Sequence, residues 1–306
     1  MLETTWFVLW GLLSAVYFVL NGFDFGMGTL LPFLAKNDEE KRIIYNAAGP
    51  YWDGNEVWLI TAGGVTFAAF PKAYAVIFSA LYAPLLILLF ALIFRAVSFE
   101  FRNKKDCPQW RKFWDACQFL GNFLPALLLG VAFANLFMGI PIDGNGVYHG
   151  NIIKLLNPYG LAGGIFFVLI FCMHGALWLA LKSEGDIHER AVGAAQVVWP
   201  LVLAVALLFL ALTAFYTNLY ANYAEHPTLL VFPILAVASL LTVRVMIWAD
   251  NLLGAWFFSA LFIITVTFFG VLGMYPGIII SSIDPAYSVT VFNGASKETS
   301  YICRIW

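Results

Sequence analysis

Residues 5–34 read TWFVLWGLLSAVYFVLNGFDFGMGTLLPFL, an apolar stretch in which Asp24 is the one charged side chain. A helix needs about 20 mainly apolar residues to cross a bilayer, so this stretch is long enough to span it. It has no basic start and no small-residue cleavage pattern, which favours a retained span over a signal peptide. Seven further stretches have the same character: residues 52–70, 73–97, 113–140, 158–181, 192–218, 229–248 and 252–281.

The composition agrees with eight spans. Hydrophobic residues make up 62% of the 306 residues and charged residues 11%, whereas a soluble domain is about 25% charged. We therefore predict an all-α integral membrane protein with a single multi-span domain over residues 1–306. Short loops favour antiparallel neighbours, which predicts one four-helix bundle over residues 1–140, a second over residues 157–281, and a short extracytoplasmic tail over residues 282–306. No basic block is present, so the sequence gives no support to a nucleic-acid partner.

Lysine and arginine residues are divided unevenly between the predicted loops. Short loops rich in these residues stay in the cytoplasm. The odd-numbered loops and their membrane edges, with Arg95 counted at an edge, hold 12 of the 16 lysines and arginines. The even-numbered loops hold Lys72 and Lys154. We therefore expect the N-terminus outside the cytoplasm and, after eight spans, the C-terminus outside as well.

Asp24 is an acidic residue inside an apolar stretch that is predicted to cross the bilayer. An aspartate in the middle of a spanning helix costs ~2.5 to 3.5 kcal/mol on insertion scales, which makes it a functional candidate. It lies between Gly22 and Gly26, whose spacing is typical of closely packed membrane helices. Two interpretations stay open: Asp24 pairs with a polar group and fixes helix packing, or it takes part in ion or proton movement.

A second polar group lies at the cytoplasmic start of the second predicted span, in Trp52-Asp53-Gly54-Asn55-Glu56-Val57-Trp58. Asp53 followed three residues later by Glu56 is the pattern of a helix N-cap with a capping box. Capping does not account for the neighbouring tryptophans and Asn55. Proton or ion handling is therefore the alternative interpretation, because titratable groups gather at such sites.

The sequence offers few ligands for a redox centre. His174 is the one histidine inside a predicted span, which excludes a haem held by two histidines from two spans. We interpret His174 as a packed, hydrogen-bonded side chain. The four cysteines have no CxxC spacing, and no hydrolase or nucleotide-binding motif occurs. We therefore expect no metal site and no catalytic residue in this chain.

Five segments together resemble subunit II of bacterial cytochrome bd-type quinol oxidases in their residues, order and spacing. They are Gly22 to Gly28, Trp52 to Gly64, Phe67 to Pro71, Phe94 to Glu100 and Gly130 to Asn135. The resemblance implies a haem-free subunit of the bacterial inner membrane, paired with a subunit I that holds haems b and d. The pair would oxidise quinol and reduce dioxygen to water. Some members hold a structural quinone in subunit II, and a small third subunit is a further open question.

The resemblance also implies roles for individual residues. Asp53 matches the family's aspartate at the proton conduit, and Glu100 matches an acidic position near its mouth. The charge count places both on the cytoplasmic side, where protons must enter. Glu56, Asp24, Asn55 and Trp52 follow as supporting members of the proton pathway.

One feature departs from the family, whose second subunit usually has a ninth span. Residues 297–306 are too few and too polar to cross a membrane. A natural truncation, a sequence error or a helix supplied by another chain would each explain the difference. Two other functions remain open: a proton-coupled membrane transporter, and a structural scaffold that shields a partner's cofactors.

Overall fold

The computed structural model describes residues 1–296 and is built almost entirely of helices. Seven of its helices are long and apolar enough to cross a membrane, and α3 is a less apolar eighth that packs along α1. The all-α membrane architecture is therefore confirmed. The elements are α1 Leu2–Leu34, α2 Asp38–Ala48, α3 Trp52–Ala69, α4 Pro71–Ala80, α5 Tyr82–Phe101, α6 Pro108–Met138, α7 Ile152–Leu155, α8 Pro158–Lys182, α9 Gly185–Tyr216, α10 Leu219–Glu225, η1 Pro227–Leu230, α11 Val231–Trp248, α12 Leu252–Met274, β1 Gly277–Ile279, η2 Pro285–Tyr287 and β2 Val289–Thr290.

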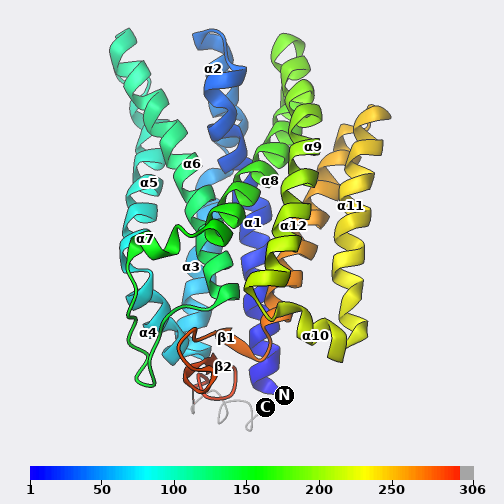
Figure 1. Cartoon of the computed structure of the whole chain (residues 1–306). Coiled ribbons are helices and arrows are strands. Elements are labelled where there is room, and N and C mark those ends of the chain that lie inside the picture. The colour runs from blue at the N-terminus through cyan, green and yellow to red at the C-terminus, as the bar shows by residue number, and fades with distance from the viewer. Residues whose placement is uncertain (297–306) are drawn as a thin grey trace.

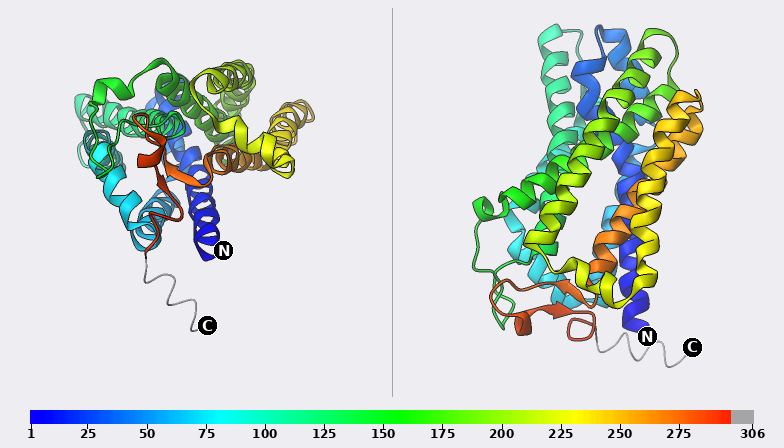
Figure 2. Two further views of the ribbon diagram at one scale, coloured as in Figure 1. Left: turned by 60° about the horizontal axis from the view of Figure 1, so that its bottom comes forward. Right: turned by 45° about the vertical axis from the view of Figure 1, so that its right-hand side comes forward.

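The long helices run side by side between two ends of the molecule (Figure 1). One end carries α2 and the connections that join α5 to α6, α8 to α9 and α11 to α12. The opposite end carries the N-terminus, α4, α10 and the small β1–β2 sheet (Figures 1 and 2). The odd-numbered connections thus lie at one end and the even-numbered connections at the other, as expected when successive spans run in opposite directions.

Helix starts follow local sequence signals. Asn37, Asn157 and Asn251 each accept a hydrogen bond from a backbone amide in the first turn of α2, α8 and α12, at 2.8 to 2.9 Å. Proline occupies the first position of α6 and α8, where its missing amide hydrogen is not needed. The residue that follows α6 is Gly139, whose φ of +93° favours glycine.

Helix α1 lies at the centre and packs on α3, α6, α8 and α12. Its contact with α8 is close because both helices supply glycine there. A Cβ on Gly26 would overlap the Phe171 carbonyl oxygen, and one on Gly175 would lie 2.5 Å from the Met27 nitrogen. The close helix contact predicted from Gly22 and Gly26 is therefore present. α8 also packs on both α6 and α9, so residues from both halves share one core, and the division into two bundles stays a prediction.

Two predicted spans are interrupted or shortened in the structure. The predicted span 73–97 is divided at Leu81 into α4 and α5, because Pro84 has no amide hydrogen to bond the Ala80 carbonyl. The predicted span 252–281 ends as a helix at Met274, two residues before Pro276.

The chain after α12 folds back on the molecule. It forms β1, which pairs with β2, and the Ser296 amide donates to the Ala69 carbonyl oxygen at 2.9 Å. Residues 282–296 of the predicted tail thus contact the end of α3. Its last ten residues, with Cys303, lie outside the described residues.

Candidate functional site

The first turn of α3 positions Asp53, and it does so without a capping box. α3 begins at Trp52, its N-cap residue is Tyr51, and no side chain caps it. The predicted N-cap role of Asp53 is therefore wrong. The helix starts earlier because the Asn55 amide already donates to the Tyr51 carbonyl oxygen at 3.0 Å. Asp53 is exposed and has no hydrogen-bond or ion-pair partner in the described part of the chain.

Glu56 has an ion pair in place of the predicted reciprocal cap. A terminal nitrogen of Arg95 lies 2.9 Å from Glu56 Oε1, so α3 and α5 are joined by opposite charges. Both terminal nitrogens of Arg95 also donate to Asn21 Oδ1 of α1 at 3.0 Å. The guanidinium lies 5.0 Å from the centre of the Phe25 ring, in a cation–π contact. Arg95 thus connects three helices.

Asp24 lies one turn from Asn21 on α1 and is 3% exposed. The Asn55 side-chain amide donates to Asp24 Oδ2 at 2.8 Å and to the Leu20 carbonyl oxygen at 3.0 Å. Asp24 Oδ1 is buried and accepts no hydrogen bond in the described part of the chain. Asp24 therefore has a polar partner on α3, while the glycines beside it contact α8.

Trp52 and Glu100 lie where α3 and α5 meet. The rings of Trp52 and Phe99 stack with centroids 5.3 Å apart and planes 5° apart. Glu100 follows Phe99, is exposed, and has no hydrogen-bond or ion-pair partner within residues 1–296. The structure thus brings Glu56 together with the buried Asp24 and Asn55 beside Arg95, and leaves Asp53 and Glu100 exposed.

The sequence interpretation missed Arg95 as a member of this group. It assigned Arg95 to a membrane edge, whereas the side chain is 1% exposed and lies inside α5. An arginine flanked by apolar residues of a span is a signal that could have identified it, because such a charge needs a buried partner. Asn21, three residues before Asp24, was also missed, because the sequence does not show that Arg95 is its partner.

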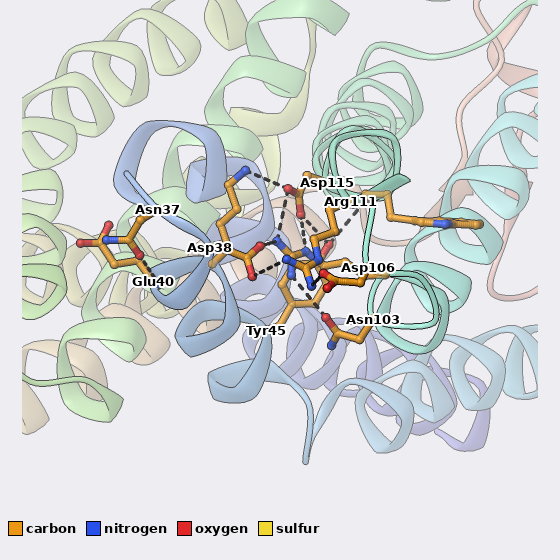
Figure 3. A network of polar contacts seen from close by, with 11 residues as sticks. Asn37, Asp38, Glu40, Tyr45, Asn103, Asp106, Arg111 and Asp115 are labelled. Atoms are coloured by element: carbon orange, nitrogen blue, oxygen red, sulfur yellow. Dashed lines mark hydrogen bonds and ion pairs between the residues drawn. The ribbon is translucent and has the colours of Figure 1, made fainter. Parts of the chain in front are cut away.

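A second polar network lies at the end of the molecule that carries α2 (Figure 3). Arg102 is 1% exposed and donates to Asp38 and Asp115 at 2.6 Å each. Lys41 pairs with Asp115 at 2.8 Å. Arg111 pairs with Asp38 at 3.4 Å and with Asp106 at 2.7 Å. This network ties α2 to the start of α6 and the end of α5. It is called the rim network below.

His174 has the packed, hydrogen-bonded role that the sequence predicted. Its Nδ1 lies 2.6 Å from Ser259 Oγ and its Nε2 lies 3.2 Å from the Val19 carbonyl oxygen. The ring also stacks on Trp256 with centroids 5.3 Å apart. Both ring nitrogens are engaged and an indole covers one face, so His174 does not fit the axial position of a haem. Within residues 1–296, no cluster of three His, Cys, Asp or Glu side chains could hold a metal ion.

An apolar cavity of about 140 Å³ lies among α6, α8, α9, α11 and α12. Phenylalanines such as Phe133, Phe166 and Phe262 line it. Thr267 is the one polar side chain among the described lining residues, and its hydroxyl donates to the Ile263 carbonyl oxygen at 2.7 Å. The cavity therefore suits an apolar chain but offers no free donor for a quinone carbonyl group. The predicted structural quinone stays a prediction without assigned residues.

Comparison with known proteins agrees with this arrangement. The family model of cytochrome bd terminal oxidase subunit II matches residues 2–306. The chain belongs to the cytochrome bd oxidase subunit II family. It is 36% identical to cytochrome bd ubiquinol oxidase subunit 2 of Bacillus subtilis, over 98% of this chain and 88% of the relative. It is 34% identical to cytochrome bd-I ubiquinol oxidase subunit 2 of Escherichia coli, over 100% of this chain and 89% of the relative.

A solved structure shows the same fold. A chain of the bd oxidase from Geobacillus thermodenitrificans superposes with a TM-score of 0.80, with 18% identity, over 99% of this chain and 92% of that chain. Membership in this family makes the chain a subunit of a respiratory oxidase complex in a membrane. The predicted family, enzyme class and multi-pass membrane character are therefore confirmed. A subunit I partner and haems in the complex follow from the family, in a bacterial plasma membrane.

Proposed function

We propose that this subunit conducts protons from the cytoplasm toward haems b and d, which lie in subunit I, while the complex reduces dioxygen to water with quinol electrons. The observation that carries the proposal is the series of acids along α3 and α1. Asp53 is exposed, Glu56 lies one turn further along α3, and Asp24 is buried beside Asn55. Carboxylates are groups that can take up and release protons along such a series.

The direction of entry rests on the loop charges. Asp53 lies in the first turn of α3, which follows α2, and Glu100 lies in the last turn of α5. Figure 1 shows α2 and the α5–α6 connection at the same end of the molecule. The loops at this end and their edges hold most of the lysines and arginines. Because such loops stay inside, we propose that this end faces the cytoplasm and that the N-terminus lies outside.

We propose that subunit I packs on the outer face of α3. Val57, Ile60 and Phe67 are 54%, 74% and 62% exposed. A Cβ added at Gly54 or Gly64 would meet no atom within 4 Å. A helix of subunit I packed on this face would approach closely, because small residues allow backbones to come together. Asp53 and Glu56 would then lie at the boundary between the subunits.

Replacement of Asp53 tests the conduit directly. Asp53→Asn, made in the whole oxidase, should keep normal haem content and lose quinol-dependent oxygen uptake by about tenfold or more, because an amide cannot relay a proton. Asp186→Asn is the matched control, since Asp186 is also an exposed acid in a first helical turn. Its oxygen uptake should be unchanged. Full activity in Asp53→Asn would contradict the proposal.

Isolation from the native membrane separates this function from a proton-coupled transporter. The oxidase function requires a haem-bearing partner that purifies with the chain, and oxygen uptake that depends on quinol. A transporter would move substrate in vesicles that contain this chain alone. Purification without any haem protein would contradict the oxidase function in this organism's membrane.

A further inference from the structure

Three ionisable side chains meet between α1, α3 and α5 with unequal charge. Arg95 supplies one cation, while Asp24 and Glu56 supply two acids. Asn55 and Glu56 are neighbours on α3, and Asn21 and Asp24 are one turn apart on α1, so the two hydrogen-bonded links belong to one cluster. Asp24 lies within electrostatic reach of both Arg95 and Glu56. One guanidinium can neutralise only one of the two carboxylates.

The contacts show which acid the guanidinium neutralises. Arg95 is 2.9 Å from Glu56, and its terminal nitrogens otherwise bond Asn21. Glu56 is also the more accessible acid, with a side chain 20% exposed. Glu56 therefore has both a cation at ion-pair distance and partial access to solvent.

Asp24 has neither of these advantages. It is 3% exposed, it receives one hydrogen bond from an uncharged amide, and its other oxygen accepts none in the described part of the chain. A buried carboxylate ion without a cation in direct contact and with an unbonded oxygen is strongly disfavoured relative to the neutral acid. The proton of the cluster should therefore reside on Asp24.

We propose that Asp24, Glu56 and Arg95 form a site that holds a single exchangeable proton, with Arg95 as the positioning residue that fixes this number. The inference rests on the proposed proton conduction and extends it to a storage site inside the subunit. When Asp24 gives up the proton, the cluster has one net negative charge, which attracts the next proton. When Asp24 is protonated again, the three groups sum to zero, so a second proton gains no such attraction.

Other groups around Asp24 do not change this count. Tyr17 on α1 is buried and is the other titratable side chain that interacts with Asp24. On α8, His174 is bonded to Ser259 and to the Val19 carbonyl oxygen. On α6, Asn122 is an uncharged amide that faces Gly28. Arg95 and Glu56 are thus the charged side chains that interact with Asp24 in residues 1–296.

Infrared spectroscopy of the purified oxidase complex tests the inference. A protonated carboxylic acid has a carbonyl band that shifts in D2O, and the wild-type complex should show the band of Asp24 near neutral pH. Asp24→Asn should remove it. Glu56→Gln should remove it as well, because Asp24 then becomes the sole acid of the cluster that interacts with Arg95 and ionises. Asp186→Asn should keep the band and the oxygen uptake of the wild type.

A charge-compensated variant gives the sharpest result. Arg95→Met combined with Glu56→Gln removes one cation and one anion, so Asp24 should regain its proton and the band should return. Return of the band supports the single-proton count, and haem content verifies assembly. If the double variant does not assemble, the two single variants decide, since a band that persists in Asp24→Asn or in Glu56→Gln overturns the inference.

The outcome is separable from that of the proposed function. Full oxygen uptake in Asp53→Asn, with the expected infrared pattern intact, would remove the entry route and leave the single-proton site. Loss of uptake in Asp53→Asn, together with a band that is unchanged in Glu56→Gln, would support the entry route and overturn the single-proton site.

Discussion

The rim network and the Arg95 cluster are both built from ion pairs, but their charges balance differently. In the rim network, Lys41, Arg102 and Arg111 meet Asp38, Asp106 and Asp115, so each cation has an acid. In the Arg95 cluster, two acids share one cation, and Asp24 keeps an unbonded oxygen. In a matched network every charge already has an opposite charge beside it, whereas an unmatched network leaves one carboxylate that a proton can neutralise. The comparison fits a structural role for the first region and is the reason that we propose proton handling for the second.

The largest effect should come from breaking the matched region. Arg102→Met should destabilise the complex by about 3 to 5 kcal/mol, because Asp115 would keep a nearly buried charge without its closest partner. The measurement is the thermal unfolding midpoint of the purified oxidase, together with oxygen uptake per haem. Uptake per haem should stay near that of the wild type. A stable complex with slow uptake would instead place Arg102 in the proton route. The rim network and the Arg95 cluster would then no longer differ in role.

An intermediate effect should come from replacing Glu100, the residue proposed at the proton entrance. Glu100→Gln should slow oxygen uptake by about two- to threefold, less than Asp53→Asn, because water reaches an exposed group by several routes. Steady-state uptake with excess quinol measures it. A loss equal to that of Asp53→Asn would mean that Glu100 is an obligatory relay.

The smallest effect should come from pH at the rim. Burial opposes the ionisation of Asp38, but the hydrogen bond from Arg102 and the charges of Arg102, Arg111 and Lys41 outweigh it and hold the pKa of Asp38 below 3.8. A lowered folded-state pKa means that this stabilisation is present above pH 3.8 and is lost as pH falls through the folded-state value.

Asp38→Asn isolates that contribution. The variant should be slightly less stable than the wild type at neutral pH, and the difference should shrink as the pH falls below 3.8. Unfolding midpoints of both proteins across this range measure the effect. A difference that grows on acidification would show that another group dominates the rim network.

The site could be predicted from the sequence only in part. Asp24, Asn55, Glu56 and Trp52 stand out because polar groups in apolar spans need partners, and the structure gives all four specific contacts. Arg95 was missed because its partner lies 39 residues away, so that its apolar neighbours could indicate a buried charge but not the acid that it pairs with. The capping box was wrong for a related reason, since Glu56 found a stronger partner than a backbone amide.

The sequence by itself determined the helical membrane fold, the approximate limits of most spans, and the family, because apolar length and rare polar residues are local signals. Tertiary structure alone decided which acid faces which cation, where α4 separates from α5, and how the chain after α12 folds back. These outcomes depend on contacts between residues distant in sequence, where the energy of a buried charge is set by its neighbours in space.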